Sequence, residues 1–428
     1  MIETVRPGDT VGSVAARLNV PEDLLAELNG ITVNTPLAVG QALVALTPEV
    51  LYTIRPGDTL YSVARAFSTS VVQLYRNNPG LGGDPQVEVN RTLVIRYREE
   101  PSRPLDVNAY AYPFIAGTLL NETLPYLTYF TPFTYGFTRT GELIPPRDEG
   151  MIVRALRYGV TPWMHLSTLT DQGNFSSELG LALLQDPQAQ ATLTANILRT
   201  MEEKNYQGLD VDFEFIGAAG AALYAEFITA LRQQLAPLGY EVVVALAPKV
   251  RADQPGTLYE GHDYAALGAA ADGVLLMTYE WGYTYGPPMA VAPIPSVRRV
   301  LDYAVSVIPR EKIFMGVPTY GYDWPLPFTP GVTRARSLSN PEAVELALIH
   351  GADIQYDAVA QAPFLVYTAE GIAHEVWFED ARSIAAKLDL VAEYGFRGIG
   401  YWNLDRPFPQ NWSLLNSRYR VENRGRGL

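Results

Sequence analysis

Three acidic residues alternate with apolar residues in one short segment of the 428-residue chain. Asp210, Asp212 and Glu214 are separated by Val211 and Phe213. The apolar, β-branched surroundings predict a β-strand, and alternate side chains of a strand share one face. Crowded carboxyl groups cannot all ionise cheaply, so we expect one of them to keep its proton through a raised pKa. A carboxylic acid in that state can serve as a general acid.

The opposite face of this segment is apolar and is expected to face away from the acids. It carries Leu209, Val211, Phe213 and Phe215. Alternating acids could also mark a solvated strand face, or bind calcium or magnesium, but no further cluster of oxygen ligands lies nearby in the sequence. The histidines have no HxxxH spacing and cysteine is absent, so we expect no metal site and no cofactor. Catalysis is the favoured interpretation.

The acids must be positioned by a larger set of strands. Eight apolar runs after residue 105 alternate with helical patterns, which predicts a (β/α)8 barrel with the acids at the carboxyl end of the fourth strand. The expected strands are 106–112, 126–131, 162–167, 208–215, 241–246, 273–279, 313–318 and 398–402. The stretch between the last two strands is too long for a loop. We expect an α+β insertion at about 325–392, with a helix at 341–350 and strands at 364–367 and 375–378.

A repeat precedes the barrel. The sequence RPGDT occurs at residues 6–10 and again at 55–59, and each copy opens a strand–helix–helix–strand pattern. We therefore expect two small βααβ units at 1–47 and 50–98. A charged, proline-bearing linker at 99–104 would connect them to a catalytic domain spanning 105–428.

These two units resemble LysM modules, which bind glycans that contain N-acetylglucosamine. The second unit matches the (Y/T)-x-(V/I)-x-x-G-D-(T/S)-x-x-S-(V/I)-A opening throughout, and the first departs from it only at Glu3. The alternative is that PGDT is merely a turn followed by a helix cap. The resemblance implies a glycan groove in each module, bordered by Gly8 and Asp9 in the first and by Gly57 and Asp58 in the second.

Three segments of the barrel resemble glycosyl hydrolase family 18, the chitinase-like enzymes. QGLDVDFE at 207–214 is similar to its D-G-x-D-x-D-x-E motif, MTYEW at 277–281 to its M-x-Y-D-(W/F) segment, and GIGYW at 398–402 to its G-x-x-x-W ending. Two positions depart from the family pattern. Gln207 replaces the first aspartate of the motif, and in the family that aspartate is expected to belong to a supporting charge relay. Glu280 replaces the aspartate that follows the tyrosine, here Tyr279.

The resemblance implies a retaining mechanism in which the 2-acetamido group of the substrate is the nucleophile. Glu214 would be the general acid and then the base, and Asp212 would orient the acetamide N–H. Asp210 would modulate Asp212, and Tyr279 would donate a hydrogen bond to the acetamide oxygen. The expected substrate-binding residues are Trp402, as an apolar floor beneath the sugar, and Met277, Glu280, Trp281 and Tyr129.

The substrate must carry a 2-acetamido group, as chitin and peptidoglycan both do. The segments at 287–294 and 374–383, together with the paired LysM-like units, resemble spore germination hydrolases that act on cortex peptidoglycan. We therefore expect an N-acetylglucosaminidase of the bacterial spore. The apparent absence of a signal peptide fits that location. A chitinase and a non-catalytic glycan-binding coat protein are the alternatives.

Composition limits the other partners. The 32 basic and 46 acidic residues give a net charge of −14, which argues against binding to nucleic acid. No apolar run approaches the ~18 residues of a membrane span, so no membrane partner is expected. The sequence leaves the oligomeric state open.

Overall fold

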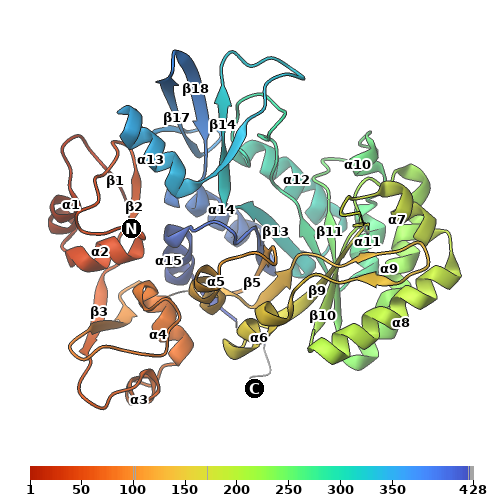
Figure 1. Ribbon diagram of the computed structural model, residues 1–428, viewed down its shortest axis with the longest axis horizontal. Coiled ribbons are helices and arrows are strands. Elements are labelled where there is room, and N and C mark those ends of the chain that lie inside the picture. The colour runs from red at the N-terminus through yellow and green to blue at the C-terminus, as the bar shows by residue number, and fades with distance from the viewer. Residues whose placement is uncertain (100, 102, 171, 423, 425–428) are drawn as a thin grey trace.

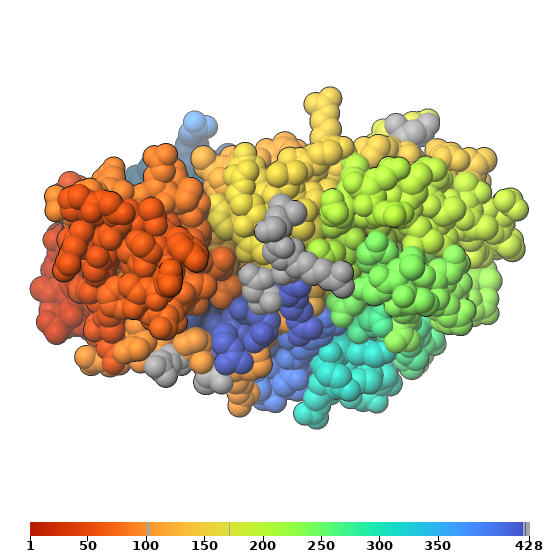
Figure 2. Space-filling model, turned by 90° about the horizontal axis from the view of Figure 1, so that it is seen from below, coloured from red at the N-terminus to blue at the C-terminus, as the bar shows by residue number. Residues whose placement is uncertain are grey.

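The computed structural model describes residues 1–99, 101, 103–170, 172–422 and 424. Two small units at the amino end lie against one side of a large barrel, and a β-rich lobe rises above it (Figure 1). Seen from below, the two units form a single lobe in red and orange beside the barrel (Figure 2). Within the described residues, no helix is both long and apolar enough to cross a membrane.

The large domain is a closed barrel of eight parallel strands, as predicted. Pairing of Ile399 with Val107 joins the last strand to the first and closes it. The strands are β5 (Arg103–Ala111), β6 (Tyr129–Pro132), β9 (Thr161–Ser167), β10 (Gly208–Asp212), β11 (Glu241–Leu246), β12 (Gly273–Leu276), β13 (Ile313–Pro318) and β19 (Gly398–Trp402). A further strand, β20 (Tyr419–Val421), pairs with the beginning of β5 outside the closed ring.

Helices surround the barrel. They are α5 (Gly117–Thr123), α6 (Glu149–Arg157), α7 (Ser177–Leu184), α8 (Pro187–Lys204), α9 (Ala221–Leu235), α10 (Thr257–Glu260), α11 (Tyr264–Ala270), α12 (Ile294–Val307), α14 (Ala381–Tyr394) and α15 (Pro409–Arg418). Their ends follow local sequence signals. Asp186 caps the start of α8 ahead of Pro187, and Asn205 ends that helix in the left-handed conformation. A small hairpin, β7 (Gly136–Phe137) and β8 (Leu143–Ile144), follows β6.

Four boundaries of the barrel strands differ by three residues from the sequence prediction, and two of these are the early ends of β10 at Asp212 and of β12 at Leu276. The strand expected at 126–131 begins at Tyr129, because Leu124–Tyr126, which contains Pro125, forms a turn of 3₁₀ helix. The first barrel strand begins at Arg103, inside the expected linker, where it pairs with β20. Residues 100 and 102 of that linker lie outside the described part of the chain.

The insertion between β13 and β19 is a five-stranded antiparallel sheet with one helix. Its elements are β14 (Tyr320–Pro325), β15 (Arg336–Ser339), α13 (Asn340–His350), β16 (Gln355–Asp357), β17 (Ala362–Ala369) and β18 (Ile372–Trp377). It begins before the expected residue 325, because β14 follows β13 almost directly. The expected range of 325–392 also included most of α14, which packs against the barrel helices α12 and α15.

Both amino-terminal units have the expected βααβ order. The first contains β1 (Ile2–Thr4), α1 (Val11–Leu18), α2 (Glu22–Leu28) and β2 (Ala42–Val44). The second contains β3 (Pro48–Thr53), α3 (Leu60–Ala66), α4 (Val71–Asn77) and β4 (Thr92–Tyr97). The repeated threonines, Thr10 and Thr59, each begin a helix with a reciprocal capping box to the serine three residues on. The RPGDT repeat therefore encodes the same strand-to-helix turn twice.

Candidate active site

A cavity of about 500 Å³ opens at the carboxyl ends of the barrel strands. Active sites of this fold lie at that end, because the loops that follow the strands converge there. Six of the residues predicted from the sequence line the cavity, namely Asp212, Glu214, Met277, Tyr279, Glu280 and Trp402. Aromatic residues complete its wall, namely Tyr110, Tyr112, Phe133, Phe175, Phe215 and Tyr259.

Asp210 is fully buried and hydrogen-bonded within the barrel. The hydroxyl of Tyr110, on β5, donates to its Oδ2 at 2.6 Å. His165 on β9 places Nε2 3.9 Å from that oxygen and 3.7 Å from Oδ2 of Asp212. The other ring nitrogen, Nδ1, lies 2.6 Å from the hydroxyl of Thr134. Burial lowers the pKa of His165 to about 3, so its ring is neutral near pH 7 and forms no ion pair with the acids.

The acids themselves favour protonation. Burial raises the pKa of Asp210 to about 7 against the opposing effect of the Tyr110 hydrogen bond. Burial, with the charges of Glu214 and Asp210, raises the pKa of Asp212 well above its usual range. Burial and the charge of Glu280 raise the pKa of Glu214. Because these groups interact, their protons titrate as a set, and at least one remains on the cluster near neutral pH.

One oxygen of Asp212 has no partner within the described residues. Its Oδ1 is buried and has no hydrogen-bond partner in the part of the chain that the structure describes. A buried acceptor without a donor is unfavourable, and a substrate donor would satisfy this oxygen once the carboxyl group turns it toward the cavity. The amide N–H of an acetamido group is a donor of this kind.

The end of β10 is held by two side chains that the sequence did not single out. His262 accepts the N–H of Ala247 at Nδ1 (2.8 Å), and its Nε2 lies 3.0 Å from the carbonyl oxygen of Phe213. These partners require the neutral Nε2–H tautomer, which agrees with a pKa that burial lowers to about 4. The hydroxyl of Tyr224 accepts the N–H of Phe213 and donates to the carbonyl of Val211, both at 3.3 Å. Together they fix the backbone that leads to Glu214.

Phe215 corrects the expected strand pattern. The strand ends at Asp212, and Phe215 has a φ of +55°, in the left-handed region. Its side chain is 50% exposed and lines the cavity instead of facing the helices. Phe213 keeps the expected side and stacks on Tyr224 of α9. The alternation of the sequence therefore holds from Leu209 to Glu214 and fails at Phe215, after the strand has ended.

Glu280 is positioned by the insertion. It also has a positive φ, +66°, and its Oε1 accepts hydrogen bonds from the hydroxyls of Tyr320 and Tyr322 on β14, the latter at 3.0 Å. The insertion thus reaches back to the cavity wall. The two tyrosines alternate on one strand, which is a sequence signal for a shared face, but nothing in the sequence indicates that this face meets Glu280.

Two predicted substrate contacts, Tyr129 and Trp281, and the motif residue Gln207 lie outside the cavity lining. Tyr129, expected to bind substrate, is at the amino end of β6, where it stacks on Trp163 and accepts a hydrogen bond from Arg397. Gln207, expected near the charge relay, lies at the same end, with its N–H bonded to the carbonyl of Pro162. Trp281 packs against the core beyond β12 and is absent from the cavity lining. Membership in a family motif therefore placed neither Gln207 nor Trp281 in the cavity lining.

The described residues contain no group of three or more histidine, aspartate or glutamate side chains arranged to hold a metal ion.

Comparison with known families identifies both parts of the chain. Glycosyl hydrolases family 18 matches residues 170–406, which is more than half of the chain, and the LysM domain matches residues 4–45 and 52–96. The chain belongs to glycosyl hydrolases family 18. The two βααβ units are LysM modules, and both resemblances inferred from the sequence are confirmed.

Relatives of this family 18 chain include spore enzymes and chitinases. The cortical fragment-lytic enzyme of Bacillus anthracis is 37% identical over 431 residues, covering 99% of each chain. The crystal structure of the Bacillus cereus spore cortex-lytic enzyme SleL superimposes with a TM-score of 0.85 at 36% identity, covering 100% of this chain and 99% of that one. A chitinase from Chromobacterium violaceum matches 73% of this chain and 98% of its own at 28% identity, with a TM-score of 0.68. The protein is a glycosidase.

The buried acid of this family 18 barrel predicts a pH-dependent stability. Asp210 has a pKa of about 7 when folded and an ordinary value of 3.8, so the folded chain binds a proton that the unfolded chain releases. Its contribution to the free energy of unfolding therefore decreases as the pH rises from about 4 to 7. We expect Asp210→Asn to have nearly the same melting temperature as the wild type at pH 4. At pH 8 we expect the melting temperature of the variant to be a few degrees higher than that of the wild type. Calorimetry across this range measures it, and a difference independent of pH would refute the assignment.

Proposed function

We propose that this family 18 enzyme hydrolyses the β-1,4 bond after N-acetylglucosamine in spore cortex peptidoglycan, and that it acts in the spore. The observation that carries the proposal is the match to the cortical fragment-lytic enzyme over 99% of both chains, which includes both LysM modules as well as the barrel. The cavity adds chemical support, because it combines raised-pKa acids with an apolar aromatic wall.

Glu214 is the proton donor in this proposal. Its side chain lines the cavity, and its raised pKa keeps it protonated at pH values at which an ordinary glutamate is already ionised. It protonates the glycosidic oxygen as the bond from that oxygen to C1 breaks. The carbonyl oxygen of the substrate's acetamido group attacks C1 and forms an oxazolinium ion. Glu214, now ionised, takes a proton from water as the water oxygen attacks C1. The bond from C1 to the oxazolinium oxygen breaks and restores the acetamido group, and the two inversions at C1 retain the configuration.

Asp212 and Tyr279 hold the acetamido group for this attack. Asp212 accepts the acetamide N–H and stabilises the positive charge that develops on the ring, a role that its place in the cavity wall supports. Tyr279 donates its hydroxyl to the acetamide oxygen, since burial raises the pKa of that phenol and keeps it protonated. Asp210, bonded to Tyr110, lies behind Asp212 and adjusts how readily it ionises.

Trp402 is proposed as the floor beneath the sugar. It lines the cavity and meets the rings of Tyr110, Tyr112 and Phe133 at centroid distances of 5.7, 5.9 and 5.0 Å. These edge and tilted contacts immobilise the indole, so a sugar ring can pack on it without ordering the side chain first.

Chitin is the alternative substrate. The similarity to the chitinase of Chromobacterium violaceum favours it, and the proposed mechanism requires only a 2-acetamido group. Parallel incubation with purified cortex fragments and with chitooligosaccharides, followed by mass spectrometry, separates the two. We expect efficient cleavage of the cortex fragments. Cleavage confined to chitooligosaccharides would refute the cortex assignment.

Glu280 is expected to set the alkaline limit of activity. Its negative charge raises the pKa of Glu214, and Tyr320 and Tyr322 hold it in place. Replacing Glu280 by glutamine removes that charge and lowers the pKa of Glu214. The acid then loses its proton at a lower pH, so the alkaline limb of kcat/KM should move toward acid. A profile that stays fixed or moves to higher pH would show that Glu280 does not act on Glu214.

A further inference from the structure

Both LysM modules pack their second helix against α15, and the first module alone also docks through the loop between α2 and β2. The second module uses its second helix, α4, where Arg76 donates to the carbonyls of Pro125 (2.6 Å) and Val421 (3.2 Å). The first module, besides the contact of α2 with α15, uses the loop between α2 and β2. The carbonyl of Val39 accepts the N–H of Ile354 in the insertion at 2.9 Å. Arg382 of α14 donates to the carbonyl of Gly40 at 3.1 Å.

This contact closes the loop of the first module. Gly40 has a φ of +82°, and a Cβ added there would lie 1.8 Å from the carbonyl oxygen of Ile354, so the two backbones touch. Ala38, 4% exposed, packs in the apolar cluster of the insertion that includes Leu338 and Ile354. The red module accordingly sits against the blue insertion and α14 in Figure 1.

The same loop is open in the second module. Asn90 is the counterpart of Gly40, because both have positive φ, and their N–H groups bond to the equivalent carbonyls of Ile54 and Val5 at 2.9 Å. Residues 88–90 are exposed, and Val89, the counterpart of Val39, is 49% exposed. One wall of the groove expected for a LysM module is therefore free in the second module and covered in the first.

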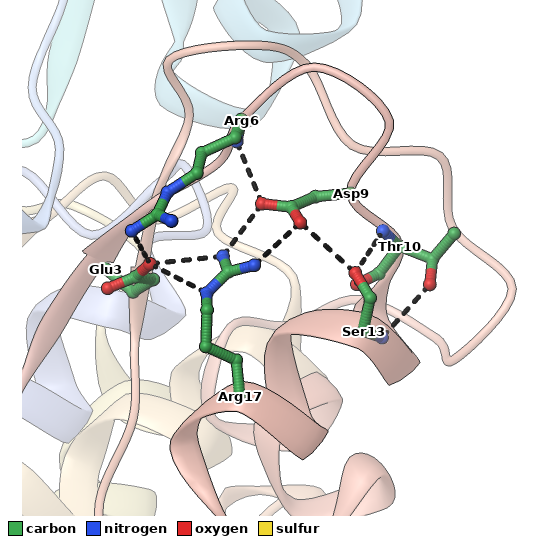
Figure 3. Close-up of polar contacts among 6 residues, drawn as sticks. All are labelled: Glu3, Arg6, Asp9, Thr10, Ser13 and Arg17. Carbon is green, nitrogen blue, oxygen red and sulfur yellow. Dashed lines mark hydrogen bonds and ion pairs between the residues drawn. The ribbon is translucent and has the colours of Figure 1, made fainter.

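The other wall also differs between the modules. In the first, Arg17 binds both carboxylate oxygens of Asp9 at 2.8 Å and also reaches Glu3, so the RPGDT turn is tied to β1 and α1 (Figure 3). The hydrogen bond from Arg17 holds the pKa of Asp9 well below its usual range. Ala66 occupies the position of Arg17 in the second module. There Asp58 accepts from the Arg55 N–H and the Tyr52 hydroxyl.

An exposed aromatic side chain marks the second module. Tyr61 directly follows the start of α3 beside the RPGDT turn and is 70% exposed, whereas its counterpart in the first module is Gly12. An aromatic ring next to polar loop groups suits a sugar, which offers an apolar face and hydroxyl edges.

We propose that the second LysM module binds the N-acetylglucosamine-containing glycan, and that the first module instead fixes the pair to the barrel and the insertion. The inference rests on the proposed function in one respect, since the bound glycan is taken to be the polymer that the barrel cleaves. It assigns unequal roles to two repeats whose turn sequences are identical.

A single-label experiment tests the assignment. The chain has no cysteine, so Arg6→Cys and Arg55→Cys each create one unique thiol, at equivalent and exposed positions just before the two turns. Each full-length variant also carries Glu214→Gln, to slow digestion, and is labelled with a bulky maleimide–polyethylene glycol. Co-sedimentation with purified insoluble peptidoglycan then gives an apparent Kd, and the melting temperature checks that each labelled protein is folded.

The label at position 55 should raise the apparent Kd by about tenfold or more, and the label at position 6 should change it by less than about twofold. Tyr61→Ala without a label should also weaken sedimentation. The assignment would be overturned if the two labels weakened binding equally, if the label at position 6 weakened it more, or if the label at position 55 did not weaken it. Release of fragments by the unlabelled wild type is scored separately, because its failure would contradict the proposed function and not the difference between modules.

Discussion

Replacing Glu214 by glutamine will lower kcat on cortex fragments by about 10³- to 10⁴-fold while the protein stays folded. The magnitude is the upper range of what a positioned proton donor contributes. Glutamine keeps the size of the side chain but cannot protonate the leaving oxygen. A nitrophenyl leaving group needs little protonation, so the rate of glycosidic bond cleavage on such a substrate should fall much less in Glu214→Gln. Steady-state and single-turnover rates on both substrates measure the difference.

Glu226→Gln is the matched control for this variant. Glu226 is exposed on α9, the helix that packs behind β10, so the same chemical change there leaves the cavity untouched. Its kcat should equal that of the wild type. Equal losses on the natural and the nitrophenyl substrate would contradict the role of Glu214 as proton donor. Retention of wild-type turnover in Glu214→Gln would contradict the mechanism altogether.

Replacing Asp212 by asparagine will lower kcat by about 10²- to 10³-fold, because it removes a group that stabilises charge in the transition state. Asparagine cannot carry the negative charge that balances the oxazolinium ion. Binding of a thiazoline analogue of that ion should therefore weaken far more than binding of the product sugar. Inhibition constants for the two ligands, measured on wild type and variant, give this comparison.

The variant Asp210→Asn distinguishes the role of Asp210 from that of Asp212. Asp210 is buried beneath the cavity wall and bonded to Tyr110, so its removal should reduce kcat less than the removal of Asp212. Equal weakening of thiazoline and product binding in Asp212→Asn would indicate that Asp212 shapes the cavity without acting on the charge. A larger kcat loss for Asp210→Asn would reverse the roles of the two acids.

Much of the barrel and its acids could be predicted from local sequence. Asp210 and Asp212 lie on one face because a strand alternates, and that rule needs no knowledge of the rest of the chain. The capping boxes at Thr10 and Thr59 are equally local. The family motifs added the identities of Tyr279 and Trp402 as cavity residues, which periodicity could not supply.

The remaining features depend on contacts between distant segments. Phe215 turns into the cavity because the strand ends at Asp212, and nothing in the alternation marks that end. Tyr129 is the first residue of its strand and so lies at the wrong end of the barrel for substrate binding, an error of strand boundary. His262 and Glu280 are held by partners 49 and 40 residues away. Docking of Gly40 on Ile354 joins segments from opposite ends of the chain.

Identifying the glycosidic bond that is cleaved tests the proposed function most directly. Purified cortex fragments are digested with wild type and with Glu214→Gln, the new reducing ends are reduced with borodeuteride, and the terminal sugar alcohols are identified by mass spectrometry. We predict labelled N-acetylglucosaminitol from the wild-type digest and almost none from the variant. Labelled muramitol as the main new end, or equal labelling by the two proteins, would contradict it.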